Sequence, residues 1–542
     1  MRIDKDILKK QNAIENLKIL GLIWGFLKYY HPIVATGKFN WDKKLIEMLP
    51  LIIESDSKVE RDKVLESWVK ELGDFEICRS ITENSNDSVI LEPDLDWIEN
   101  SSLSKELVKI LLKVKRAERT GKNHYISFVR NAGNPRFKNE KSYPTKNYPD
   151  TKKRILSLFR YWNMVQYFFP YRYLIKEDWK DVLEEFIPKF VNVENRNDYL
   201  SAILELITRI NDLHAAIYGK DYWLEGIKGS YSAPIDLSYI ENKVVITGFY
   251  NDKYKNTAVP KIGDVVLEIN GKPVEKLIEN HLKYSPGSNL LTKIRTALLD
   301  IIRTDDKSIE IKIERNNKTS VKIIQCYKCN DLDFSIRYRH TNDDNALTIL
   351  KSKIAILNNT KLKRNDIPSF WEKISKTKGL IIDCRPCPLE FPVYELCKHL
   401  LPTKLPFSRW SEVESKVPGM FKIKSHMYTG RKNKNYYKGK VVLLINEVST
   451  SSAEFQIMAY RLHPNSIVVG SATAGTDGNM SFLTLPGKIV TAFTGIGIYY
   501  PDGSETQCIG ILPDIEIKPT IKGIREGRDE LMEKAIEIIE NN

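Results

Sequence analysis

Ser451, which follows an apolar run, could be the nucleophile of an enzyme. The segment "INEVSTSSAEFQIM" (445–458) completes that run, and Ser451 lies three positions before Glu454. This S-x-x-E spacing is that of a capping box, in which the serine closes the first turn of a helix, and this is the commoner role. A serine at a strand-to-helix junction could instead attack a carbonyl carbon if a base takes its proton. The segment predicts the helix and leaves both roles open.

A histidine far upstream is the candidate base. His214 lies in the segment "INDLHAAIYG". An imidazole accepts protons near neutral pH, where a carboxylate is a poorer base. The alternative is an ordinary half-buried histidine, and only the need for a base elsewhere separates the two interpretations.

An internal duplication places this histidine. Matching residues recur at a constant offset of 138 positions (162 minus 24): Trp24, Pro32, Trp41, Leu45 and Pro50 match Trp162, Pro170, Trp179, Leu183 and Pro188. Each copy predicts an aromatic helix, a short loop and a second amphipathic helix. The register continues to Asp74 and Asp212, and two residues later Glu76 of the first copy corresponds to His214 of the second. Only the second copy carries a base suited to neutral pH.

Length and composition indicate a globular protein of several domains. A chain of 542 residues suggests about three or four domains, and 42% hydrophobic residues argue against disorder. The net charge of +13 is spread along the chain among acidic residues, which favours a solvated surface and no nucleic-acid binding. The start lacks a signal-peptide pattern, and no apolar stretch is long enough to form a transmembrane helix. We therefore expect a soluble chain.

The cysteines predict neither a disulfide scaffold nor a metal site. Their number, seven, is odd, and they form no compact framework. The two CxxC pairs, at 326–329 and 384–387, are much farther apart than the pairs of a zinc ribbon, and both follow strand-like runs. We expect no metal and no organic cofactor.

Four regions follow from the periodicity. Residues 1–146 hold the first helical copy and a linker, and residues 147–228 hold the second copy with His214. Residues 229–328 read as short strands with a helical stretch over 278–302, and the turn "KIGDVVLEINGKPV" resembles the PDZ domains of bacterial proteases. Residues 340–542 contain near-continuous apolar strands, which are typical of an α/β domain. The predicted fold class is multidomain α/β.

The C-terminal third resembles peptidase family S41, which contains the tail-specific (C-terminal-processing) proteases and the tricorn core protease. The resemblance rests on a strand, a small-hydroxyl turn and a helix, followed by "VVGSATAG", "GILPDIEIKPT" and "GRDELMEKAIE". It implies a crotonase-like ββα catalytic domain with the nucleophile at Ser451. A serine at a helix N-terminus faces backbone N–H groups, so the N–H of Ser452 is an expected oxyanion donor.

The resemblance also shows which base to expect. The processing proteases activate their serine with a lysine after "VG-x-x-T-x-G", but Thr476 occupies that position and no lysine lies between Lys440 and Lys488. The tricorn branch instead uses an upstream histidine, and His214 lies in the corresponding region. The sequence therefore predicts a His-based site.

Two residues compete for the third place in that site. The tricorn branch has a glutamate just before its "G-x-x-PD" motif, and this position falls on Gln507, with Glu505 two residues earlier. Both would share one face of a strand, so either could orient His214, but only Glu505 could stabilise an imidazolium by charge. The tricorn histidine is preceded by a serine, whereas Leu213 stands here.

The second oxyanion donor is the weakest part of the resemblance. The family commonly has a glycine-rich loop after the strand "LIIDCR", where this chain has Pro386, Cys387 and Pro388. Proline has no N–H, so Cys387 is the only candidate donor within that tripeptide. Two hypotheses follow: a serine-type peptidase cleaving unfolded or C-terminal peptide segments, or a catalytically inactive S41-fold protein that binds peptides.

The remaining expectations follow from the first hypothesis. A peptide or an unfolded protein is the predicted partner, and the sequence leaves the oligomeric state and the natural substrate open. By family resemblance the protein would be exported to the periplasm or cell envelope, with the cytoplasm as the alternative. A ring nitrogen of His214 should lie about 2.6–3.2 Å from the Ser451 oxygen, or somewhat farther in an unliganded form. The other ring nitrogen should face Glu505 or Gln507.

Overall fold

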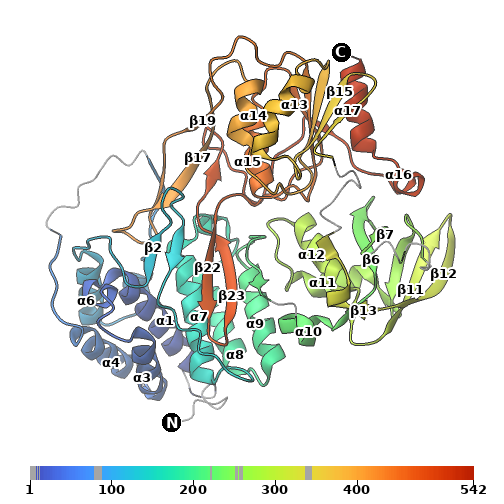
Figure 1. Ribbon diagram of the computed structural model, residues 1–542. Helices are drawn as coiled ribbons and strands as arrows, with labels where there is room; N and C mark the ends of the chain where they lie inside the picture. Colours follow the sequence, from blue (N-terminus) through green and yellow to red (C-terminus); the bar gives the residue numbers. More distant parts are fainter. Residues whose placement is uncertain are drawn as a thin grey trace.

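The computed structural model describes residues 8, 10, 12–78, 88–219, 222–250, 254, 260–335 and 345–541. In Figure 1 a helical body (blue to green) lies beside a smaller β-rich body (yellow-green), and an α/β body (yellow to red) lies above both. The predicted start of the last region, residue 340, lies outside the described residues.

Both copies of the repeat fold into the predicted helices. The main helices are α1 (Ala13–Tyr30), α3 (Trp41–Glu54) and α4 (Lys58–Lys70) in the first copy, and α7 (Thr151–Phe168), α8 (Trp179–Val191) and α9 (Arg196–Thr208) in the second. In each copy, two tryptophans each donate their indole N–H to the backbone carbonyl of the other. The N···O distances are 3.1 and 3.0 Å for Trp24 and Trp41, and 2.6 and 3.1 Å for Trp162 and Trp179. The two copies thus share the same tryptophan brace.

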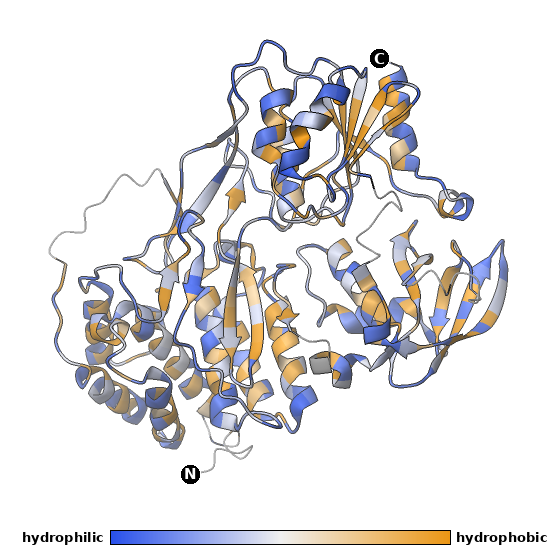
Figure 2. Ribbon diagram, viewed as in Figure 1, coloured by the Kyte–Doolittle hydropathy of each residue, from blue (hydrophilic) through white to orange (hydrophobic). Residues whose placement is uncertain are grey.

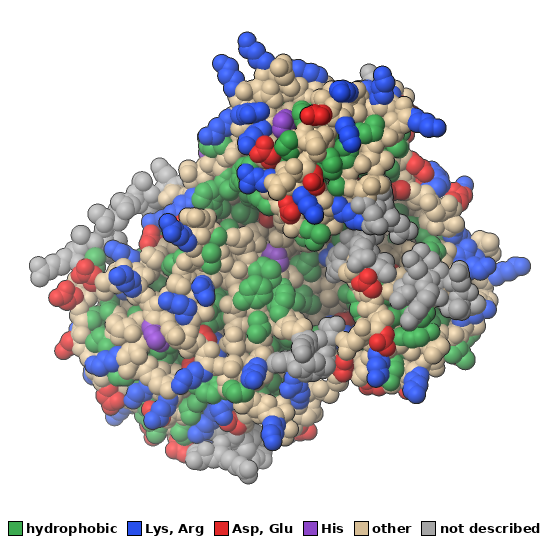
Figure 3. Space-filling view, viewed as in Figure 1, with side chains coloured by type: hydrophobic (Ala, Val, Ile, Leu, Met, Phe, Trp, Pro, Cys, Tyr) green, Lys and Arg blue, Asp and Glu red, His purple; other side chains and the backbone are tan. Residues whose placement is uncertain are grey.

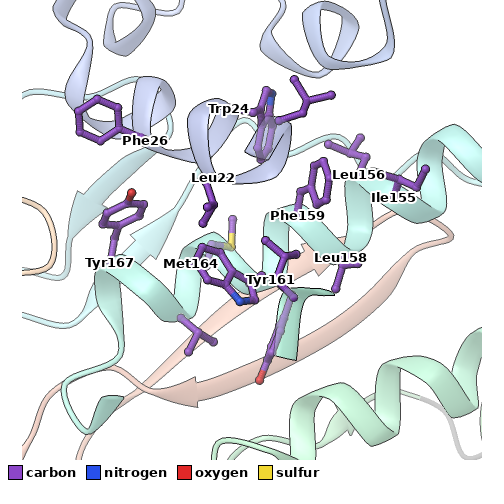
Figure 4. Packing of buried hydrophobic residues seen from close by; sticks show 14 of the residues in the cluster. Leu22, Trp24, Phe26, Ile155, Leu156, Leu158, Phe159, Tyr161, Met164 and Tyr167 are labelled. Carbon is purple, nitrogen blue, oxygen red and sulfur yellow. The ribbon is translucent and has the colours of Figure 1, made fainter. Parts of the chain in front are cut away.

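The copies pack on each other through equivalent positions of α1 and α7. A Cβ atom on Gly25 would lie 1.8 Å from the side chain of Asn163, which is 138 positions later in the chain. A Cβ atom on Gly21 would lie 2.8 Å from the ring of Phe159, again at the same offset. Figure 4 shows Phe159 among the buried side chains where α1 and α7 face each other. Because the copies share one hydrophobic core, the two predicted helical regions form a single body.

A hairpin from the C-terminal region also enters this core. Strands β22 (Met480–Leu485) and β23 (Ile489–Thr494) run down beside α7 (Figure 1), and Leu483, Leu485, Ile489 and Phe493 pack among the helices. Strand β23 also pairs with β4 (Ile217–Tyr218), which begins three residues after His214. The hairpin therefore joins the loop that carries His214 to the region that carries Ser451.

The β-rich body is an antiparallel sheet packed against two helices. The strands follow the order β12-β11-β8-β7-β6. Their bounds are β6 (Ile235–Ile240), β7 (Lys243–Phe249), β8 (Val265–Ile269), β11 (Ser308–Arg315) and β12 (Lys318–Gln325). The predicted helical stretch 278–302 belongs to two helices, α11 (Val274–Leu282) and α12 (Leu290–Asp300). It breaks because Pro286 and Gly287 interrupt it and Asn289 caps α12 in a capping box with Thr292.

The α/β body has helices on both faces of a sheet. The order is β14-β15-β16-β20-β21-β25, parallel except for β14 at the edge. The strands are β14 (Leu347–Ile349), β15 (Ile354–Asn358), β16 (Gly379–Asp383), β20 (Lys440–Ile445), β21 (Ser466–Gly470) and β25 (Ile515–Glu516). One face is covered by α13 (Ile367–Ile374), α14 (Val393–Leu400) and α15 (Ser452–Tyr460), and the other by α17 (Glu530–Glu540). Figure 2 shows apolar strands between these layers, as expected for a parallel sheet buried on both sides.

The surface carries its charge in a dispersed form. On the face shown in Figure 3, Lys and Arg side chains alternate with acidic and uncharged ones. Among the described helices, none combines the length and the apolar character needed to cross a bilayer.

Candidate active site

Ser451 occupies a sharp turn between β20 and α15. Its backbone angles are φ 52° and ψ −113°, whereas the helix-capping serines Ser57 and Ser104 have φ −138° and −60° with extended ψ. A cap residue normally has extended backbone, and a positive φ at a non-glycine residue costs of order 1–3 kcal/mol. Strain of this kind at a strand-to-helix turn is typical of a nucleophile elbow, which exposes a serine oxygen above a sheet.

A buried carboxyl group holds this strained turn. Glu454 accepts hydrogen bonds from the N–H groups of Ser451 (3.0 Å), Gly475 (2.8 Å) and Thr476 (3.0 Å). The oxygen that accepts from Gly475 also accepts from the Thr473 hydroxyl at 2.5 Å. Burial raises the pKa of Glu454 to about 7, although these donors oppose the shift. The four donors fix the turn and the loop 473–476 as one unit.

The loop after β16 begins beside the same turn. The Ser449 hydroxyl donates to the carbonyl of Cys384 at 2.8 Å. The next residue, Arg385, is buried and pairs with Asp383 at 2.7 Å and Asp529 at 2.8 Å. These contacts fix the start of the loop that contains Pro386, Cys387 and Pro388.

The two predicted oxyanion donors belong to Ser452, next to the serine, and to Cys387, in the loop after β16. Ser452 is the first residue of α15, so its N–H lies outside the hydrogen-bond ladder of the helix. Cys387 is half-buried, and burial raises the pKa of its thiol, which keeps the sulfur neutral near pH 7. The Cys387 thiol donates to the carbonyl of Pro388 at 3.9 Å.

His214 lies in the loop between α9 and β4 and is 8% exposed. Its Nδ1 atom lies 2.8 Å from the hydroxyl of Thr494, at the end of β23. The carboxylate of Asp212, which is fully buried, accepts from the same hydroxyl (3.0 Å), from Thr494 N–H (2.6 Å) and from His214 N–H (3.0 Å). Burial lowers the pKa of His214 and the Asp212 charge opposes that shift, so the ring is neutral near pH 7.

The two residues expected beside the ring have other environments. Glu505 accepts a short hydrogen bond from the Tyr173 hydroxyl. Gln507 is buried, and neither atom of its amide has a hydrogen-bond partner in the part of the chain that the structure describes. The partner of Nδ1 is Thr494 rather than either of them, because the β4–β23 pairing brings the end of β23 to the ring. Sequence reasoning missed Thr494, and only its place on a predicted strand could have suggested it.

Ser451 and His214 are joined through other residues. No hydrogen bond between their side chains occurs among the described residues, so the expected direct contact is not formed in this structure. Instead, Leu213 N–H donates to the Ser288 hydroxyl (3.1 Å), and this hydroxyl makes a short contact with that of Thr476. The Thr476 carbonyl in turn accepts from Ser451 N–H at 2.8 Å. The position of the family's lysine thus lies between the two loops.

A second link runs through Cys508. Its N–H donates to the Gly475 carbonyl at 2.8 Å, and its sulfur lies 3.6 Å from the Asn211 carbonyl. By contrast, Glu76 of the first copy is exposed, and its carbonyl accepts from Glu118 N–H at 2.9 Å. Among the described residues, the loop of the second copy is attached to the Ser451 region, and that of the first is not.

Comparisons with known proteins agree with this architecture. Residues 353–517 match the family model for peptidase family S41, and residues 229–327 match a PDZ domain model. No curated protein matches the sequence. The match at 229–327 and the sheet order above confirm the predicted multidomain α/β fold class with a PDZ-like domain.

The similar solved structures include three of CPAF. A serine-to-alanine mutant has a TM-score of 0.57 at 13% identity, covering 72% of this chain and 98% of that one. Mature CPAF has a TM-score of 0.56 at 13% identity, with 72% and 96% covered. The complex of mature CPAF with lactacystin has 0.55 at 14% identity, with 72% and 99% covered. At this identity the likeness shows a shared fold. Together with the family-model matches, it shows a PDZ domain at 229–327 followed by a region at 353–517 that matches peptidase family S41.

Proposed function

We propose that this protein is a serine-type peptidase that cleaves unfolded or C-terminal peptide segments, with Ser451 as nucleophile and His214 as general base. The backbone of Ser451 is the observation that carries the proposal. A serine needed only as a cap has no reason to adopt φ 52° and ψ −113°, and four donors to Glu454 maintain that conformation.

The chemistry follows the general scheme of serine acyl transfer. The Ser451 oxygen attacks the peptide carbonyl carbon, and His214 Nε2 takes the hydroxyl proton. The negative oxygen of the tetrahedral intermediate accepts from the N–H groups of Ser452 and Cys387. The C–N bond then breaks as His214 returns the proton to the leaving amine. Water, deprotonated by His214, hydrolyses the acyl ester and restores the serine.

A histidine base suits this site because the sequence has no lysine between Lys440 and Lys488, on either side of Ser451. Thr476 stands at the lysine position, and its hydroxyl contacts Ser288. The loops of His214 and Ser451 are linked through Ser288 and Thr476, and we propose that peptide binding brings the two side chains within reach of proton transfer. Catalytic hydrogen bonds are often long or absent in unliganded enzymes and shorten in the substrate complex.

The PDZ domain contacts the nucleophile turn directly. Arg295 of α12 donates to the carbonyl of Glu447 at 2.7 Å, and Asn289 donates to that of Ala474 at 3.1 Å. PDZ domains bind an extended peptide by adding it to a sheet edge, and we propose that this domain delivers such a peptide to the serine. This contact supports unfolded or C-terminal segments as substrates, because only an extended chain can pair with a sheet edge.

Hydrolysis of unfolded casein tests the proposal. Ser451→Ala should lower kcat/KM by about 10³-fold or more, since it removes the attacking oxygen. Ser452→Ala is the matched control: it deletes the neighbouring hydroxyl but keeps the N–H, and we expect activity within about tenfold of wild type. Equal hydrolysis by wild type and Ser451→Ala would exclude Ser451 as the nucleophile.

A second candidate is a peptide-binding protein without turnover. It is favoured by the absence of a Ser451–His214 hydrogen bond among the described residues and by the prolines at 386 and 388. Peptide binding that survives Ser451→Ala, with no hydrolysis by wild type, would support this alternative.

A further inference from the structure

Three side chains from distant parts of the chain form a buried hydrogen-bonded line. Asp212 precedes β4, Thr494 ends β23, and His214 lies between Asp212 and β4. All three are buried, and the line runs from Asp212 Oδ1 to Thr494 Oγ1 (3.0 Å) to His214 Nδ1 (2.8 Å). Building on the proposed function, we propose that Asp212 and Thr494 are positioning residues that fix His214 as the Nδ1-protonated tautomer, with Nε2 left as the base.

Counting protons fixes the direction of each hydrogen bond. A threonine hydroxyl has one proton to donate, and a carboxylate can only accept. The Thr494 proton is therefore donated to Asp212, and its oxygen must accept the second bond. In a neutral imidazole one nitrogen carries the proton and the other has a free lone pair. His214 therefore donates through Nδ1, which leaves the lone pair on Nε2.

The carboxylate is fixed independently of the ring. Asp212 also accepts from the backbone N–H groups of Thr494 (2.6 Å) and His214 (3.0 Å). These bonds compensate for its burial and fix the position of its oxygens as hydrogen-bond acceptors. Its Oδ1 atom lies 3.8 Å from Nδ1, close enough to stabilise an imidazolium when Nε2 takes the serine proton.

Three other titratable groups near this line are neutral. Tyr161 of α7 and Cys508 lie near Asp212, and the Tyr218 hydroxyl donates to the His214 carbonyl at 2.9 Å. Burial raises the pKa of all three groups, so none is charged near pH 7. Burial is the larger influence on the pKa of His214, and the Asp212 charge opposes it.

The line belongs to the second copy alone. Asp74, at the position equivalent to Asp212, is exposed and pairs with Lys113 at 3.8 Å. The shared ancestry of the copies therefore does not explain why Asp212 is buried under Thr494. If Asp212 only attached β23 to the loop, the hydrogen bond that it accepts from the Thr494 backbone N–H would be sufficient. The hydrogen bond between the Thr494 hydroxyl and the His214 ring would not be needed.

Nitrogen-15 NMR of the histidine rings tests the tautomer whether or not the protein is active. In wild type we expect His214, assigned by its loss in His214→Gln, to be protonated at Nδ1 and not at Nε2. Asp212→Asn offers Thr494 a donor, which lets the hydroxyl donate to the ring. We expect this variant to shift His214 to the Nε2-protonated form and to lower kcat/KM on casein by about 10³-fold or more.

Two substitutions at Thr494 separate positioning from packing. Thr494→Ser keeps the hydroxyl and should retain the tautomer and kcat/KM within about threefold. Thr494→Val keeps the shape but not the hydroxyl, and should lose about 10²-fold in kcat/KM and leave a mixture of tautomers. Wild-type His214 protonated at Nε2, or equal activity and tautomers in Thr494→Ser and Thr494→Val, would overturn the proposal. Absence of casein hydrolysis together with the expected wild-type tautomer would reject the peptidase and leave the positioning of His214 supported.

Discussion

The two copies of the helical repeat share one frame but differ in what covers them. Both have the reciprocal tryptophan brace between their first two main helices. Asp74 and Glu76 of the first copy are exposed, whereas Asp212 and His214 of the second are buried. The difference arises because β23 pairs with the strand that follows His214. The two copies contain equivalent loops, and the pairing of β23 with β4 makes the loop of the second copy a candidate site.

The interiors of the two copies also differ. His31 of the first copy corresponds to Phe169 of the second, and Gly25 corresponds to Asn163, each at the offset of 138 positions. His31 is buried beside the ring of Phe75 (4.8 Å between centroids), and neither ring nitrogen has a hydrogen-bond partner within the described residues. An unpaired buried imidazole is a cost that the second copy avoids.

Replacing His31 by phenylalanine, the residue at the equivalent position 169, should remove a loss of stability at acidic pH. Burial lowers the pKa of His31 to about 4, below the ordinary value of 6.5. Between these values the unfolded chain binds a proton that the folded chain does not. The free energy of unfolding therefore falls as the pH drops from 6.5 toward 4, and protonation of His31 does not change it above pH 6.5. The loss is roughly 2–3 kcal/mol at pH 4.5. We expect His31→Phe to abolish it.

Urea unfolding at pH 7.5 and pH 4.5 measures this effect as a difference between variants. His124→Phe, at an exposed position of the first copy, is the matched control and should keep the wild-type difference between the two pH values. The same acid-induced loss in His31→Phe as in wild type would show that His31 is not the group responsible.

A smaller effect is expected where the copies meet. A methyl group on Gly25 would overlap the amide of Asn163, which is buried and donates to the carbonyls of Gly21 (3.0 Å) and Phe159 (2.8 Å). Gly25→Ala should therefore lower the free energy of unfolding by about 1–3 kcal/mol. Gly248→Ala is the control, because the nearest atom to its added methyl is 3.7 Å away.

A double-mutant cycle makes this prediction specific. Asn163→Ala should itself destabilise the protein, but Gly25→Ala should cost less in that background because the overlapping amide is gone. If the losses of unfolding free energy caused by the two substitutions simply add, residues 25 and 163 do not contact each other.

Local patterns predicted much of this structure. The repeat, the parallel strands and the junction at Ser451 follow from periodicity and turn residues. The S-x-x-E spacing predicted that Ser451 and Glu454 interact. It did not predict the positive φ of Ser451, which the hydrogen bond to Glu454 helps to maintain. The chemistry at His214 could not be predicted in the same way.

The sequence could not supply the partner of His214 because that partner depends on non-local pairing. Val490 pairs with Tyr218 across 272 positions (490 minus 218), and this pairing brings Thr494 to the ring. Motif spacing led to Gln507 and Glu505, since it fixes a position along the chain but not the direction of a side chain. Asp212 was visible as a repeat match, but only the fold shows that it is buried.

Labelling with a fluorophosphonate tests the central claim most directly, because the probe reacts with an activated serine without needing the natural substrate. The adduct is mapped by mass spectrometry in wild type, His214→Ala and Glu76→Ala, the last being the equivalent position of the first copy. We predict an adduct on Ser451, formed about 100-fold or more slowly in His214→Ala and at the wild-type rate in Glu76→Ala. No adduct on Ser451 in wild type, or equal labelling rates in all three proteins, would contradict a site built from Ser451 and His214.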